Sequence, residues 1–188
     1  MIIAVGVTLI LALILVIRSR RNKHTVKQLD KIIRPYKLEE ITSIIIPDGI
    51  GGLIEIDRLV LTERGILLIG TYQITGHLFG AQQIDQWTQI VEGRSYKFAN
   101  PMHHIENAKY ALQQLAPKVP IFCRVVFTGE SDFPKGRPDN VSTLQTLEQD
   151  LKTILDAPKL SAMSDHAWQR ILRIARKNGQ AASMDGGS

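Results

Sequence analysis

Cysteine is almost absent from this chain of 188 residues, with Cys123 as its single example. One cysteine excludes an intrachain disulfide framework and a cysteine-rich zinc site. Cys123 also lies inside an apolar run, which indicates a core residue and not a nucleophile. Aromatic residues make up only 6% of the sequence and form no ladder for stacking single-stranded nucleic acid.

Basic charge is scarce outside one short segment. Residues 18–37 hold eight Lys and Arg against Asp30 alone, a net charge of +7. Residues 38–188 hold 15 Lys and Arg against 17 Asp and Glu, a net charge of −2. Because the body of the protein has no basic excess, the overall charge of +5 gives only weak support to nucleic acid as a partner.

The one long uncharged apolar run lies at the N-terminus, over residues 2–17. As a helix it would be roughly 24 Å long, a little less than a hydrocarbon core of about 30 Å. Snorkelling of the arginines behind it and local bilayer thinning would cover the difference. A cleaved signal peptide would instead need a basic start and a small-residue cleavage site, and a buried core helix would need a polar face. We therefore predict an uncleaved transmembrane anchor over residues 1–17.

The basic charges behind this run predict its orientation. All nearby Lys and Arg lie on the C-terminal side, so the positive-inside rule places that side in the cytoplasm. Residues 18–37 are expected to form a basic juxtamembrane helix, attracted to anionic headgroups by about 1 kcal/mol per charge. The sequence thus predicts a single-pass membrane protein with a cytoplasmic domain, which contacts the membrane through residues 2–17 and 18–37. It identifies no protein partner.

Strand and helix patterns alternate after residue 38. Short β-branched runs predict strands at 42–47, 53–61, 66–72, 86–91, 95–98 and 121–127. Apolar spacing predicts helices at 102–115, 143–155 and 162–177, with a turn at 76–80 and a loop at 129–141. This order indicates an α/β fold, a mixed sheet flanked by helices, over residues 38–177. The small, polar tail 178–188 is expected to be disordered.

Several short motifs occur in a fixed order within this domain. They are the E-I-D strand at 55–57 with its following glycine turn and apolar strand, G-x-x-x-G at 76–80, W-T-Q at 87–89 and K-F-x-N-P at 97–101. In this order the sequence resembles the nuclease-related domain (NERD) family, a branch of the restriction-endonuclease-like PD-(D/E)xK superfamily. The resemblance covers residues 40–128 and implies a restriction-endonuclease-like core and metal-dependent hydrolysis of nucleic acid.

The resemblance also implies where the active site should be. Hydrolysis of a phosphodiester by this family needs a metal ion, held by an Asp on one strand and by the Glu of an E-x-K motif on the next. Asp57 supplies the first carboxylate, but the E-x-K positions read Gly70-Thr71-Tyr72. Gly70 has no ligand atom, and Tyr72 offers a neutral phenol in place of a cation. We therefore predict a pseudoenzyme without a cofactor, which acts as a binding or scaffold module.

Other readings stay open. Glu55 and Asp57 lie two apart on one strand, and His104 stands where the family tends to have Gln. A divergent nuclease could use Asp57 and Glu55 as ligands of Mg²⁺ or Mn²⁺, with His104 nearby. Alternatively, Asp57 is a hydrogen-bonded carboxylate, Glu55 is a solvated edge residue, and the chain is a structural protein of the membrane surface.

Overall fold

The computed structural model describes residues 24–155, 157–159 and 165–175. The chain divides into two compact units, Met1–Pro35 and Tyr36–Ser188. Residues 24–33 are helical, within the predicted juxtamembrane helix 18–37, and a short 3-10 turn, η1 (Arg34–Tyr36), follows. The predicted anchor and the tail 178–188 lie outside the described residues. Among the helices that are described, none has the length and apolar character needed to cross a bilayer.

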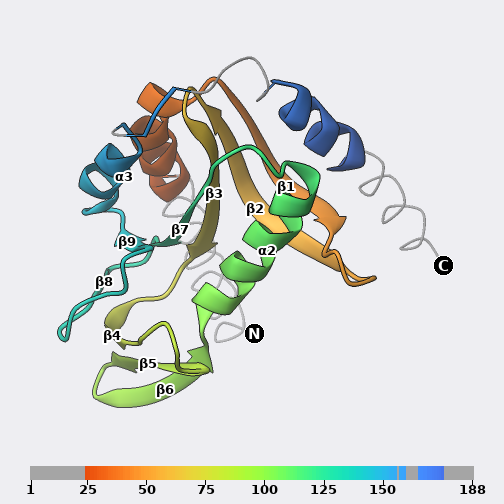
Figure 1. Ribbon diagram of the computed structural model, residues 1–188. Coiled ribbons are helices and arrows are strands. Elements are labelled where there is room, and N and C mark those ends of the chain that lie inside the picture. Colours follow the sequence, from red (N-terminus) through yellow and green to blue (C-terminus); the bar gives the residue numbers. More distant parts are fainter. Residues whose placement is uncertain (1–23, 156, 160–164, 176–188) are drawn as a thin grey trace, which may run out of the picture. The chain divides into compact units, whose positions relative to one another are not determined.

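A five-stranded mixed sheet forms the centre of the second unit (Figure 1). Its strands, in spatial order, are β1 (Glu39–Pro47), β2 (Leu53–Thr62), β3 (Gly65–Tyr72), β7 (Ile121–Phe127) and β9 (Val141–Thr143). The first three are antiparallel neighbours, while β3–β7 and β7–β9 are parallel pairs. The prediction of a mixed sheet is thus confirmed, and β1, β2, β3 and β7 lie close to their predicted ranges.

A second, four-stranded sheet was not predicted. Its order is β6 (Arg94–Ala99), β5 (Gln86–Val91), β4 (Gly76–Phe79) and β8 (Ser131–Asp132). The expectation of a single sheet was wrong, because residues 76–79 of the predicted turn form a strand. Gly76 starts this strand at φ +89°, and a Cβ there would lie 2.4 Å from the carbonyl oxygen of Ile90. Only glycine allows the chain to change direction at that contact.

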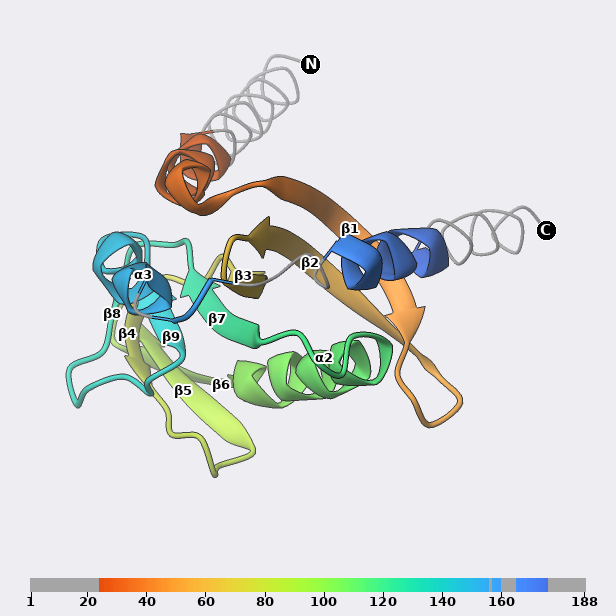
Figure 2. The ribbon, with the colours of Figure 1, turned by 45° about the horizontal axis from the view of Figure 1, so that its top comes forward.

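Helices lie on both sides of β7. α2 (Pro101–Leu115) and α3 (Leu147–Leu155) flank this strand from opposite sides (Figure 2). Ile105 and Leu112 of α2 belong to one buried cluster with Leu59 and Leu68 of the sheet. α3 begins later than predicted, because residues 141–143 form β9 instead of its first turn.

The last described helix, residues 165–175, packs by the apolar stripe that its sequence predicts. Trp168, Ile171 and Ala175 are buried in the main core cluster. The indole nitrogen of Trp168 donates to Glu39 Oε2 at 2.7 Å, which ties this helix to the start of β1.

An aromatic cluster accounts for two of the sequence motifs. Trp87 is fully buried and stacks on Phe127, with ring centroids 6.0 Å apart. A Cβ on Gly80 would lie 2.1 Å from the Trp87 ring, so the second glycine of the G-x-x-x-G motif makes room for the tryptophan of W-T-Q. These motif residues therefore build the packing between the two sheets and need no chemical role.

Asn100, in the K-F-x-N-P motif, holds a whole loop in place. Its side-chain amide nitrogen donates to the carbonyl oxygens of Ala81, Gln82 and Ile84 at 3.3, 3.0 and 2.8 Å. Its side-chain oxygen accepts from the main-chain nitrogen of Met102 at 2.9 Å and so caps α2. The buried Asn100 thus fixes the loop 81–85 and the start of α2 together.

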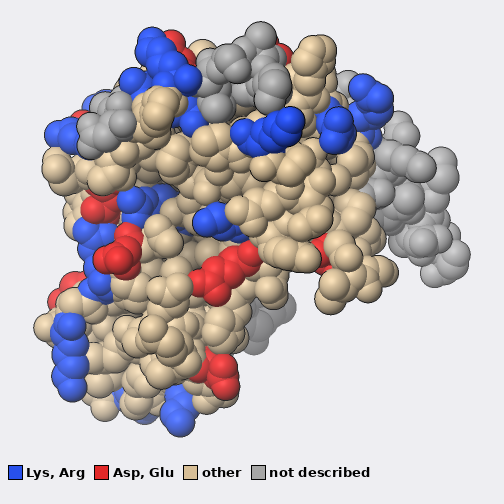
Figure 3. Space-filling view, viewed as in Figure 1, with Lys and Arg blue, Asp and Glu red and all other residues tan. Residues whose placement is uncertain are grey.

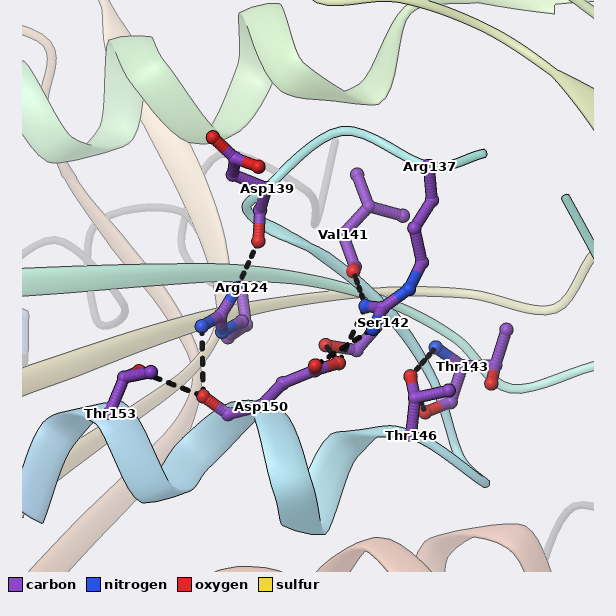
Figure 4. Close-up of polar contacts among 9 residues, drawn as sticks. All are labelled: Arg124, Arg137, Asp139, Val141, Ser142, Thr143, Thr146, Asp150 and Thr153. Carbon is purple, nitrogen blue, oxygen red and sulfur yellow. Dashed lines mark hydrogen bonds and ion pairs between the residues drawn. The ribbon is translucent and has the colours of Figure 1, made fainter. Parts of the chain in front are cut away.

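A polar cluster joins β9 to α3 (Figure 4). Asp150 on α3 receives two hydrogen bonds from Arg137, at 2.6 and 2.8 Å, and one from the Ser142 hydroxyl at 2.7 Å. Burial alone would raise the pKa of the Asp150 carboxyl, but the hydrogen bonds from Arg137 and Ser142 outweigh it, so the pKa lies below its usual value.

The contribution of this ion pair should depend on pH. Arg137→Met is expected to lower the free energy of unfolding by about 2 kcal/mol at pH 7, because a charge-assisted, partly buried pair is lost. Since the folded-state pKa of Asp150 is depressed, this stabilisation is present above its unfolded pKa and is lost as the pH falls below about 4. Urea denaturation of both proteins at pH 7 and pH 3 measures the change.

Lys159→Met is the matched control. Its partner Glu63 is 2.8 Å away, but both side chains are largely exposed, so no measurable loss is expected. A difference between wild type and Arg137→Met that is equal at pH 7 and pH 3 would contradict the proposed role of Asp150.

Candidate functional site

Asp57 lies on β2 at an interruption of its pairing with β1. The β1–β2 register pairs Thr42 with Arg58 and Ile44 with Ile56 but passes over Asp57 and Ser43, which adopts a left-handed φ of 53°. Asp57 is exposed, and its Oδ2 accepts hydrogen bonds from the main-chain nitrogen of Thr71 at 2.7 Å and from the Thr71 hydroxyl at 3.0 Å. Asp57 is therefore a hydrogen-bonded carboxylate, one of the roles that its position in a strand predicts.

Gly70 and Tyr72 flank Thr71 on β3 and lie next to Asp57. The β2–β3 register ends at the pair Arg58 and Ile69, so Asp57 and Gly70 are the next residues beyond it on the two strands. A Cβ on Gly70 would lie 3.5 Å from the Tyr72 ring and 3.8 Å from Ile105 Cδ1, which are ordinary contacts. The two positions thus share one side of the strand, as the period of two requires.

Tyr72 is electrically neutral at physiological pH. Burial raises the pKa of its phenol above the usual value, and the negative charge of Asp57 raises it further. Its ring also contacts Phe127, with centroids 5.9 Å apart. Tyr72 therefore acts as a packing residue at the place where the family pattern has a lysine.

The side chain of His104 contacts the main chain of Glu55. His104 Nε2 lies 3.0 Å from the carbonyl oxygen of Glu55, so the ring connects the first turn of α2 to β2 as a donor. Glu55 is exposed, as predicted, and pairs with Ile45 of β1, whereas the pairing of β2 with β3 begins only at Arg58, so one side of β2 is open at Glu55. The contact uses the backbone of Glu55 and not its carboxylate.

The residues Asp57, Gly70 and Tyr72 do not fit a Mg²⁺ or Mn²⁺ ion, which would need several oxygen ligands around one point. Asp57 Oδ2 already accepts two hydrogen bonds, Gly70 supplies no donor, and the phenol of Tyr72 is neutral. Within residues 24–155, 157–159 and 165–175, no three His, Cys, Asp or Glu side chains are arranged to hold a metal. We therefore derive no hydrolytic step at this site.

Thr71 is the site residue that sequence reasoning missed. It occupies the middle position of the E-x-K triplet, where alternation predicts a side chain on the other side of the strand. Its hydroxyl nevertheless donates to Asp57, at a point beyond the last paired residues of the two strands, Arg58 and Ile69. One signal in the sequence pointed to this contact: Thr71 carries a hydroxyl and lies on the strand next to that of Asp57 in the predicted hairpin.

Comparison with known proteins gives two matches. The family model of the nuclease-related domain, NERD, matches residues 19–128. An uncharacterized protein from Bacillus anthracis is 22% identical over 104 residues, which cover 53% of this chain and 49% of that protein. The chain therefore spans about half the length of this curated relative. No solved structure matches the chain.

Proposed function

The chain belongs to the nuclease-related domain family, and from this premise we propose that it is a membrane-anchored member that acts through binding and not through hydrolysis. The observation that carries the proposal is the state of the site. Asp57 is held by Thr71, while Gly70 and Tyr72 replace a carboxylate and a cation. We further propose that the mixed sheet β1–β2–β3–β7–β9 is a restriction-endonuclease-like core whose catalytic groups have been lost.

The surface charge supports a partner other than a long nucleic acid. Figure 3 shows acidic and basic side chains scattered over a mostly uncharged face. Residues 38–188 carry a net charge of −2. A surface that follows a phosphate backbone needs a continuous basic stripe. A protein partner at the membrane surface is therefore the proposal, with nucleic acid as the less supported alternative.

The absence of cleavage is the direct test. The purified full-length chain in mild detergent is expected to leave supercoiled DNA, single-stranded DNA and RNA intact in the presence of Mg²⁺ or Mn²⁺. Gel assays should show no more cleavage than with Asp57→Ala, because the wild-type site lacks a second carboxylate and a cation. Cleavage that disappears in Asp57→Ala would contradict the proposal.

One arrangement favours a second candidate function, a divergent metal-dependent nuclease. Glu55 and Asp57 are both exposed on β2, and His104 contacts the main chain beside them. Under this alternative, Glu55→Gln would abolish cleavage as completely as Asp57→Ala. The same assay thus separates the two candidates.

The membrane topology can be tested independently. Protease added to sealed right-side-out vesicles is expected to leave residues 38–188 intact, whereas protease added to inverted vesicles should digest them. The reason is the uncharged run 2–17 with all its flanking basic residues on the C-terminal side. Digestion in right-side-out vesicles, or a mature chain that lacks residues 1–17, would contradict this orientation.

A further inference from the structure

A small polar pocket lies at the first half of β7, away from Asp57. Its volume is about 230 Å³, and residues from α2, β7, the loop before β9 and α3 line it. The register pairs this half of β7 with Ile66–Ile69, whereas Asp57 contacts Thr71 beyond that segment. Pockets for drug-sized ligands are usually larger, at about 300–1,000 Å³. This pocket suits a small ligand.

The edge of β7 is open at this pocket. The main-chain N–H of Ile66 donates to the carbonyl oxygen of Pro120, and the N–H of Thr128 donates to the carbonyl oxygen of Tyr72. From Pro120 to Thr128, the main-chain groups of even-numbered residues therefore point to β3. Val125 instead donates to Asn140 on the other side. By the same alternation the N–H of Cys123 points away from β3. β9 pairs only with Val125–Phe127, so no strand covers Cys123.

Two cationic side chains flank this open edge. Lys109 reaches it from α2, and within the described part of the chain it forms no ion pair. Arg124 donates from Nη1 to the carbonyl oxygen of Asp139 and from Nη2, at 2.9 Å, to that of Asp150 (Figure 4). Both partners are main-chain oxygens, so no carboxylate hydrogen bond neutralises the guanidinium.

Two acidic residues, Asp150 and Asp139, lie near Arg124: burial lowers the pKa of its guanidinium, and their charges raise it. Asp139 is exposed, and the other nearby acidic side chains have partners outside the pocket. The Asp150 carboxylate is held by Arg137 and Ser142, as described above. Glu106, one turn before Lys109, accepts a hydrogen bond from Gln82 at 2.9 Å. Burial raises the pKa of the Cys123 thiol to about 11, so the thiol adds no negative charge. None of the pocket-lining residues is acidic.

We propose that this pocket binds a small oxyanion of the phosphate class, either inorganic phosphate or the phosphate group of a mononucleotide. Lys109 and Arg124 supply positive charge from the two sides of the sheet. The N–H of Cys123 supplies a neutral donor, and Asn140, which also lines the pocket, carries a side-chain amide that could supply a second. Cationic and main-chain donors that converge on one small space are the groups that bind phosphoryl oxygens.

The single cysteine gives this proposal a selective readout. Labelling the full-length chain with ¹⁵N-cysteine produces one amide signal, that of Cys123 at the pocket. Titration with inorganic phosphate is expected to move this signal along a saturable curve, whereas chloride at equal ionic strength should leave it in place. Tighter binding of adenosine 5′-monophosphate than of phosphate would identify a nucleotide as the ligand, and equal binding of phosphate and sulfate an inorganic oxyanion.

Substitution of the cations completes the test. Lys109→Met is expected to weaken phosphate binding about tenfold or more, because a charge-assisted hydrogen bond is lost. Lys109→Glu should abolish binding. Lys97→Met, on the exposed strand β6, is the matched control and should bind like wild type. A Cys123 signal that moves with none of these oxyanions, or that moves equally in wild type and Lys109→Met, would overturn the proposal, whatever the outcome of the cleavage assays.

Discussion

Asn100→Ala is expected to lower the free energy of unfolding by about 3 kcal/mol, roughly 1 kcal/mol from the lost helix cap and the rest from three lost amide hydrogen bonds. Asn100 is only 3% exposed, so water reaches the vacated space poorly. The substitution frees the loop 81–85 as well as the first turn of α2. Urea denaturation followed by circular dichroism measures the loss.

Two further variants separate the contributions. Asn100→Ser keeps an oxygen that can cap Met102 but loses the amide donors, so about 2 kcal/mol of the loss should remain. Asn107→Ala, at an exposed position of the same helix, is the matched control and should change the free energy of unfolding by less than about 0.5 kcal/mol. If Asn100→Ser were as stable as wild type, the amide bonds to the loop would contribute nothing.

The second sheet shows where prediction from the sequence stopped. β7 was predicted with its observed bounds because it is an almost continuous apolar run. β4 has only four residues and starts at a glycine, so its composition resembles a turn. It becomes a strand because β5 and β8 pair with its two edges, and these contacts come from distant parts of the chain. β9, with three residues, was missed for the same reason.

The candidate site was predicted in its parts but not in its connections. The proximity of Asp57 to Gly70 and Tyr72 followed from the hairpin pattern and the family resemblance. The sequence did not predict the hydrogen bonds from Thr71, or the contact of His104 with the carbonyl oxygen of Glu55. They depend on where the pairing of β2 with β3 ends and on how α2 packs against the sheet, which alternation along a single strand cannot show.

The double substitution Gly70→Glu, Tyr72→Lys is expected to create a divalent-ion site that Asp57 completes. The contacts at Gly70 leave room for a Cβ, and removal of the Tyr72 ring opens more space. The hydrogen bonds from Thr71 engage Oδ2 of Asp57 and orient the carboxylate, which leaves its Oδ1 for a metal. The new glutamate and Asp57 would supply two carboxylates on adjacent strands, as Mg²⁺ and Mn²⁺ prefer.

The expected result is a metal-dependent gain in stability. Mn²⁺ at 100 times its dissociation constant should stabilise the folded double variant by about 2.7 kcal/mol, which a thermal-shift assay detects readily. Wild type should show no such shift. The variant with Gly70→Gln and Tyr72→Lys is the matched control, since it has the same size without the carboxylate and should not respond. A shift that persists after Asp57→Ala, or no shift in the folded double variant, would mean that these three positions no longer converge on one ligand site.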